Sequence, residues 1–176
     1  MDAVGVAERA DRIIAVRNTP AATDALIECG LVAVREVQAW ADAQHAALVA
    51  KLSADGFTEN TIARAARTSL GAATKTTQRA NTLGSAPKLA EALDDGQTTA
   101  GHIDALTRAG AQLPPEQRHE LFERVDALAD VATASTVEQF SRRVTLEAKQ
   151  IQSNDGIDRL SRQRSNVRAS HWVDND

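Results

Sequence analysis

Stretches with the composition of a β-strand are nearly absent from this 176-residue sequence, and their absence is the strongest constraint on its fold. Strands favour β-branched and aromatic residues, whereas Ala has the highest helix propensity of all residues. Aromatic residues are only 3% of the chain, and much of its 43% hydrophobic content is Ala. The apolar positions that recur do so at helical spacing. We therefore predict an all-α fold, a multi-helix bundle of about seven to nine helices.

The longest predicted helix covers about Ala21–Ala54. Pro20 is suited to its first turn, and Asp55-Gly56 is a stop signal. We expect its apolar face to be buried, with Cys29 on that apolar side. The residues of this face are Ile27, Leu31, Val34, Val37, Ala41, Leu48 and Leu52. The residues that we expect in the core of the whole chain are Leu31, Val34, Leu48, Leu121, Val125, Phe140 and Val144.

Hydroxyl-bearing residues are placed to cap two of the later helices. Thr98 or Thr99 can cap a helix that starts near position 100, and Ser135 or Thr136 can cap the last long one. Glu138 lies three residues after Ser135, which is a capping-box arrangement. A turn signal, Asn-Asp-Gly at 154–156, follows that helix. We therefore divide the chain into a helical domain at 1–154 and a basic helical tail or linker at 155–176.

Charge is segregated along the chain, although its formal net charge is only −4. Residues 58–90 carry five basic side chains and one acidic one, whereas residues 91–140 carry three basic and ten acidic ones. The basic stretch is also rich in Thr, Gln and Asn. Such segregation suits a binding surface, and it equally suits packing of the acidic segment against the basic one.

Two short helices joined near Arg67–Gly71, within 58–84, suggest a helix-turn-helix. In that interpretation the second helix enters the major groove of duplex DNA. Lys75 and Arg79 are four residues apart, so we expect both on one exposed face, where they neutralise phosphates or contact guanine. The alternative is a solvated pair of polar helices in an ordinary bundle. The predicted DNA-binding residues are Arg64, Arg67, Lys75, Gln78 and Arg79, with Arg159, Arg162, Arg164 and Arg168 in the tail.

Two separated segments carry a resemblance to a known family. They are "PKLAEALDDGQTTAGHIDALTRAGAQLPPEQR" and "RLSRQRSNVRASHWVDND". Together they resemble the N-terminal helical domain of actinobacterial HNH-endonuclease-like proteins, known as domain of unknown function 222 of the thirteen-E-twelve repeat type. The first segment also loosely resembles the central DNA-binding domain of ParB-type partition proteins. The matching residues are Pro87, Leu93, Gly96, Thr99 and His102, then Arg159, Leu160, Arg162, Gln163, Arg164, Trp172, Asp174 and Asp176.

The resemblance implies a function and a partner. It implies a DNA-binding or targeting domain that precedes a nuclease domain, and the sequence ends where the family usually leads into a β-rich connector. We expect no catalysis from this chain itself, because its four histidines are scattered and none has zinc-ligand spacing. His102 suits a capping or buried polar role in the first turn of its helix, and His119 suits a solvated one. We expect no cofactor and no metal.

The remaining features concern location and partners. The single cysteine and the lack of a leader or a long apolar run predict a cytoplasmic protein with no membrane span. A second function stays open beside DNA binding. It is a helical protein–protein interaction or oligomerisation module, with a homo-oligomer as one partner, and the long Ala-rich helix and acidic segment favour it.

Overall fold

The computed structural model describes residues 1–52, 58–127 and 129–170, with side chains described as far as 154. In that part of the chain there are nine helices and no strand, which confirms the predicted all-α bundle. The helices are α1 (Ala3–Arg17), α2 (Asp24–Leu52), α3 (Thr58–Ala65), α4 (Leu70–Gly84), α5 (Pro87–Asp94), α6 (Ala100–Ala111), α7 (Pro115–Ala127), α8 (Ala129–Ala134) and α9 (Val137–Ser170).

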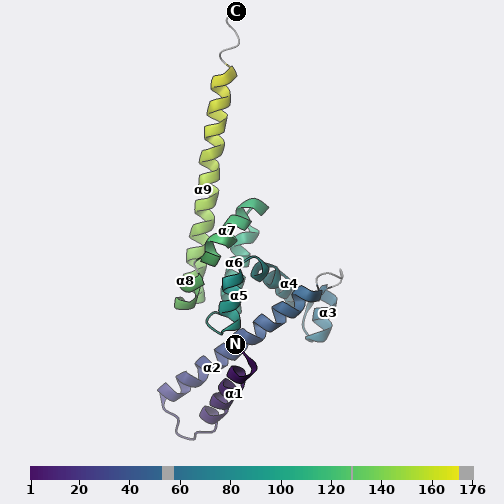
Figure 1. The fold of residues 1–176 in the computed structure, drawn as a ribbon, viewed down its shortest axis with the longest axis vertical. Coiled ribbons are helices and arrows are strands. Elements are labelled where there is room, and N and C mark those ends of the chain that lie inside the picture. The colour runs from purple at the N-terminus through teal and green to yellow at the C-terminus, as the bar shows by residue number, and fades with distance from the viewer. Residues whose placement is uncertain (53–57, 128, 171–176) are drawn as a thin grey trace, which may run out of the picture.

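Two long helices, α2 and α9, define the shape of the molecule (Figure 1). α1 packs mainly along the N-terminal half of α2, and the two form a hairpin at one end of the molecule. α4 and α5 pack on α2, while α6 and α7 pack on the first half of α9. The second half of α9 extends away from the other helices (Figure 1). None of the helices in the described part of the chain has the length and apolar character that a bilayer crossing requires.

The part of the core with the largest side chains lies between α5, α6, α7 and α9. Large side chains fill it, and the predicted core residues Leu121, Val125, Phe140 and Val144 are all buried there, each at most 1% exposed. A Cβ on Gly110 of α6 would lie 2.7 Å from a ring carbon of Phe122, so this glycine lets α7 approach closely. Leu89, Leu93, Ile103 and Leu106 are also fully buried in this core, and on α2 so is Val49.

The predicted apolar face of α2 is not the face that packs inward, so this part of the prediction is wrong. Leu31 and Leu48 expose 64% and 61% of their surface, and Val34 is half-buried. Small side chains face α1, α4 and α5 instead, because they allow the closest approach between helices. The buried residues of α2 are Gly30, Ala33, Ala39, Ala46 and Val49. We call the exposed set Ile27, Leu31, Gln38, Ala41, Leu48 and Leu52 the outer stripe of α2.

The start of α2 also differs from the sequence-based expectation. The helix begins at Asp24, and the Thr23 hydroxyl accepts a hydrogen bond from the Leu26 N–H at 3.3 Å, so Pro20 precedes the helix. Cys29 is exposed rather than buried, because the sides of α2 that pack inward belong to the small residues. The predicted stop signal at 55–56 lies outside the described residues.

The boundaries of α9 correct two further predictions. Its capping box is formed by Thr136 and Gln139, each of which accepts a hydrogen bond from the backbone N–H of the other, at 3.3 and 3.0 Å. Ser135 with Glu138 does not form it, since Glu138 pairs with Arg142 instead. The helix also continues through the predicted turn at 154–156. A single interior glycine costs a helix only about 1 kcal/mol, which the residues on both sides can offset.

Contacts from two sides fasten the α1–α2 hairpin to the rest of the molecule. The Met1 amino group lies 2.7 Å from the Asp94 carboxylate and 2.9 Å from that of Asp95, and these hydrogen bonds raise its pKa above the usual value. On the turn after α5, Gly96 has φ +74° and lies against Glu36 of α2. This left-handed residue ends α5, and glycine adopts such a conformation without strain.

Candidate functional site

A tight turn joins α3 to α4, so the predicted pair of helices joined between 67 and 71 is confirmed. Arg67 has φ +50°, the left-handed conformation that glycine usually takes in such turns. The Thr68 N–H donates to the Ala63 carbonyl at 2.9 Å, which closes α3. The Ser69 hydroxyl then accepts from the Ala72 N–H at 3.2 Å and caps α4. Local hydrogen bonds therefore fix the angle between the two helices.

One face of α4 is uncovered along most of its length. Thr74, Lys75, Gln78 and Asn81 all lie on it, and the Lys75 side chain is 69% exposed. The Thr74 hydroxyl donates to the Leu70 carbonyl at 3.0 Å, so it is satisfied within the helix. The groups left to contact a partner are therefore the longer side chains of Lys75, Gln78 and Asn81.

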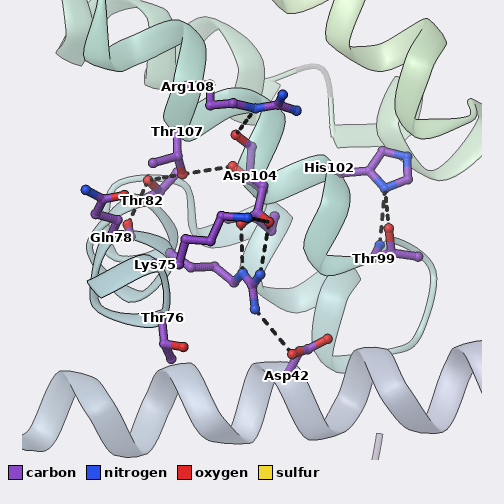
Figure 2. Close-up of polar contacts among 12 residues, drawn as sticks. Asp42, Lys75, Thr76, Gln78, Thr82, Thr99, His102, Asp104, Thr107 and Arg108 are labelled. Carbon is purple, nitrogen blue, oxygen red and sulfur yellow. Dashed lines mark hydrogen bonds and ion pairs between the residues drawn. The ribbon is translucent and has the colours of Figure 1, made fainter. Parts of the chain in front are cut away.

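Arg79 is not exposed, so the expectation that it shares one exposed face with Lys75 is wrong. Its side chain is only 14% exposed. Its Nε and Nη2 donate to the two carboxylate oxygens of Asp104 on α6, at 3.0 and 3.1 Å, and its Nη1 donates to Asp42 on α2 at 3.3 Å. Figure 2 shows Asp42 and Asp104 converging on this cluster. Four residues advance a helix by slightly more than one turn, which here carries Arg79 from the exposed side to the packed side.

The arginine therefore joins three helices instead of contacting solvent. Two parallel N–H···O bonds to one carboxylate are a strong and directional arrangement. Asp104 belongs to the acidic segment 91–140, so packing of that segment against the basic stretch accounts for Arg79. Lys75 is only loosely involved, since its Nζ lies 4.0 Å from Asp104. Thr82 and Thr107, whose hydroxyls are 2.8 Å apart, add a second polar contact between α4 and α6 (Figure 2).

Sequence reasoning missed one cationic neighbour of α4. Arg108 on α6 is exposed and, with Lys75 and Gln78, lines a hollow of about 240 Å³ between α4 and α6. Its Nε donates to the Asp104 carbonyl oxygen at 3.2 Å, which holds the guanidinium close to its own helix (Figure 2). Its position within the acidic segment gave no sign of this role, because only the packing of α6 on α4 brings it there.

The other predicted DNA-binding residues have different outcomes. Arg64 and Arg67 are exposed, and neither forms an ion pair within the part of the chain that is described. The tail residues Arg159, Arg162, Arg164 and Arg168 fall on α9, but their side chains lie outside the described residues. The structure therefore brings Lys75, Gln78 and Arg108 together, with the exposed Arg64 and Arg67 at the turn before α4.

His102 has a structural role. His102 is 5% exposed, and its Nδ1 accepts from the backbone N–H of Thr99 at 3.2 Å, so Thr99 is the cap residue of α6 and the predicted capping role is confirmed. Its Nε2 must then carry the proton and donate to the Ser135 carbonyl at 3.1 Å. His119 is exposed, 3.3 Å from Glu123. Among the described residues, no three His, Cys, Asp or Glu side chains gather as a metal site would require.

No protein-family model, curated protein or solved structure matches this chain.

Proposed function

We propose that this chain is a non-catalytic domain that binds duplex DNA, or targets a larger protein to it, through α3, the turn at Arg67 and α4. The larger protein that the sequence resemblance implies is an actinobacterial HNH-endonuclease-like protein, acting in the cytoplasm, in which a nuclease domain follows this one. The contacts to DNA would come from Arg64, Arg67, Lys75 and Gln78, with Arg108 added and Arg79 removed from the predicted set.

The observation that carries this proposal is the uncovered polar face of α4 directly after a tight interhelical turn. In helix-turn-helix proteins the second helix lies in the major groove, and residues near its N-terminus contact base edges. Lys75 and Gln78 lie further along, in the middle of α4, and both side chains are long enough to reach phosphates or bases. The exposed Arg64 and Arg67 add positive charge where the DNA backbone would pass.

Arg79 has a supporting role in this proposal. Its hydrogen bonds to Asp104 and Asp42 fix the rotation of α4 about its own axis. That rotation determines which side chains face outward. A variant of Arg79 would therefore lose DNA binding through loss of structure, and it is a poor test of DNA contact.

The better test compares two variants of the full chain that remove equal charge. Arg67→Gly with Lys75→Ala removes two cations from the proposed interface, and glycine suits the left-handed turn. Arg12→Ala with Lys88→Ala removes two exposed cations from α1 and α5. Fluorescence anisotropy with a labelled duplex should show weaker binding for the first pair only. Its log–log salt slope should be shallower by about 2 units, as expected for two lost phosphate contacts.

The basic tail needs a separate variant, because it could bind DNA independently of α4. In that variant Arg159, Arg162, Arg164 and Arg168 are all changed to Gln. If DNA binding disappears in this variant and is unaffected by Arg67→Gly with Lys75→Ala, α4 is not the interface. If neither the parent chain nor any variant binds duplex DNA at low salt, the proposed function is wrong.

The non-catalytic part of the proposal has a separate test. Incubation of the purified chain with duplex DNA and Mg²⁺ or Mn²⁺ should leave the DNA uncut. His119 is the exposed histidine that could serve as a base, and His119→Ala should change nothing. Nicking that needs the metal and disappears in His119→Ala would contradict the proposal.

A second candidate function is self-association, and the outer stripe of α2 is the observation that favours it. The stripe lies on a different helix from the proposed DNA contacts, so the two functions are compatible.

A further inference from the structure

The outer stripe is an apolar surface that the described part of this chain leaves uncovered. Leu31 and Leu48 are more than half exposed, and Ile27 and Leu52 expose 44% and 37% of their surface. α1, α4 and α5 occupy other sides of the same helix, so the stripe faces away from them. An exposed row of large apolar side chains at both ends of a helix marks a surface that contacts another protein.

The spacing of the stripe is that of a coiled-coil seam. Together with Val34 and His45, which are half-buried, its members recur at alternating intervals of four and three residues from Ile27 to Leu52. A mean repeat of 3.5 residues keeps one face directed at a partner helix when the two helices supercoil. At a rise of 1.5 Å per residue the seam is about 37 Å long. An ordinary packed helix does not need such a regular repeat on its solvent side.

The residues of the seam also pair well with one another when two copies of α2 run antiparallel. In an antiparallel pair centred between Gln38 and Ala41, Leu31 lies opposite Leu48 of the partner subunit, and Ile27 lies opposite the partner's Leu52. A two-fold axis repeats each of these layers, as symmetric dimers require. The only layer without a branched aliphatic side chain is the central one, where Gln38 faces the partner's Ala41.

Charge at the edge of the seam favours the same arrangement. Arg35 and Asp42 flank the seam on one side, one heptad apart, and their side chains are 47% and 35% exposed. Antiparallel packing brings this edge of one helix against the same edge of its partner. Arg35 then faces the partner's Asp42, whose carboxylate also accepts from Arg79 of its own chain, and the two-fold axis gives a second such pair. Parallel packing would instead place Gln38 against Gln38 and His45 against His45. It would leave Arg35 only the Glu36 carboxylate of its own chain, at 3.7 Å, and none from the partner.

We propose that a second copy of this chain packs its α2 antiparallel to α2 along the outer stripe, so that the protein is a two-fold symmetric homodimer. The inference rests on α2 alone and does not depend on DNA binding. α1 and α4 remain outside the seam, which leaves the uncovered face of α4 accessible in the dimer.

Sedimentation velocity of the full chain, without DNA, tests the association. The mass should rise with protein concentration from 18.8 kDa toward twice that value. Leu31→Asp with Leu48→Asp should keep the mass at that of one chain, because it places four charges in two layers of the dimer. Leu146→Asp is the matched control, since Leu146 is 56% exposed on α9, and it should dimerise like the parent. Circular dichroism should show equal helix content in all of them.

Disulfide trapping tests the direction of the pair. In a Cys29→Ser background, Leu31→Cys chains mixed with Leu48→Cys chains should form covalent dimers under mild oxidation. Leu31→Cys alone should not, because two copies of position 31 would be about 25 Å apart along the antiparallel helices, beyond the reach of a disulfide. A parallel pair would instead cross-link Leu31→Cys chains on their own, because it places position 31 against position 31.

Three results would refute the inference. One is a mass of a single chain at every concentration. Another is a dimer that survives Leu31→Asp with Leu48→Asp, which would show that a different surface associates. The third is cross-linking of Leu31→Cys chains on their own, which would show a parallel pair. Failure of DNA binding in the anisotropy experiment would leave all three readouts unchanged.

Discussion

α2 and the α5–α9 core use their apolar residues in opposite ways. In the core, large side chains such as Leu106 and Phe140 are packed inward and almost fully buried. In α2 the inward positions belong to residues as small as Gly30 and Ala39, while Leu31 and Leu48 point outward. The difference teaches that an apolar face and a buried face are separate properties of a helix. Small residues permit close packing, and the larger apolar residues are then left for another partner.

The largest effect on stability is expected when one large side chain is truncated in each region. Phe140→Ala should lower the free energy of unfolding by about 3–5 kcal/mol, because it leaves a cavity in a packed core. Leu31→Ala should change it by no more than about 0.5 kcal/mol in the monomer, since exposed positions contribute little. Urea unfolding at low protein concentration measures both. Equal losses would show that the outer stripe is buried within a single chain.

The second test compares two cations of α4. Arg79 packs against α2 and α6, whereas Lys75 is exposed. Arg79→Ala should cost about 3 kcal/mol, because it leaves the carboxylates of Asp104 and Asp42 partly buried without their partner. Lys75→Ala should cost about 0.5 kcal/mol or less, since its ion pair is long and exposed. A double-mutant cycle of Arg79→Ala with Asp104→Ala separates their coupling from the single losses. Little coupling between them would argue that Arg79 is free in solution.

Two glycines sharpen the comparison between packed and open positions. Gly96→Ala should destabilise the chain by about 1–3 kcal/mol, because φ is +74° and the new Cβ would lie 3.0 Å from the Glu36 backbone. Gly71→Ala on the open face of α4 should be neutral or stabilise by up to about 1 kcal/mol, since no atom lies within 4 Å and Ala is the better helix former. Thermal unfolding of the two variants should show shifts of opposite sign or of clearly different size.

The smallest expected effect is at the turn between α3 and α4. Arg67→Gly removes a side chain from a left-handed residue, which relieves about 1 kcal/mol of strain, but it also gives the unfolded chain more freedom. The net change in stability should therefore lie within about 1 kcal/mol of zero and favour the variant. A loss larger than that would mean that the Arg67 side chain makes a stabilising contact, and that this variant is not a clean probe of DNA binding.

Much of the local structure could be predicted from the sequence, because it depends on neighbours in the chain. Thr99 and His102 form a local cap in the predicted place. Gly96 ends α5 by supplying a left-handed conformation. Each of these features rests on hydrogen bonds or backbone preferences that span a few residues, so residue type and spacing were enough.

The sequence by itself determined that the chain is all-helical and where most of its helices lie, and helical spacing correctly identified the faces that contain Leu121 and Phe140. Only the tertiary structure decided which side of α2 is buried, because that depends on how closely α1, α4 and α5 approach its small residues. It also decided that Arg79 is held by Asp104 and Asp42 while Lys75 stays exposed. Those carboxylates are 25 and 37 residues away in sequence, and no local pattern records which charges folding will bring together.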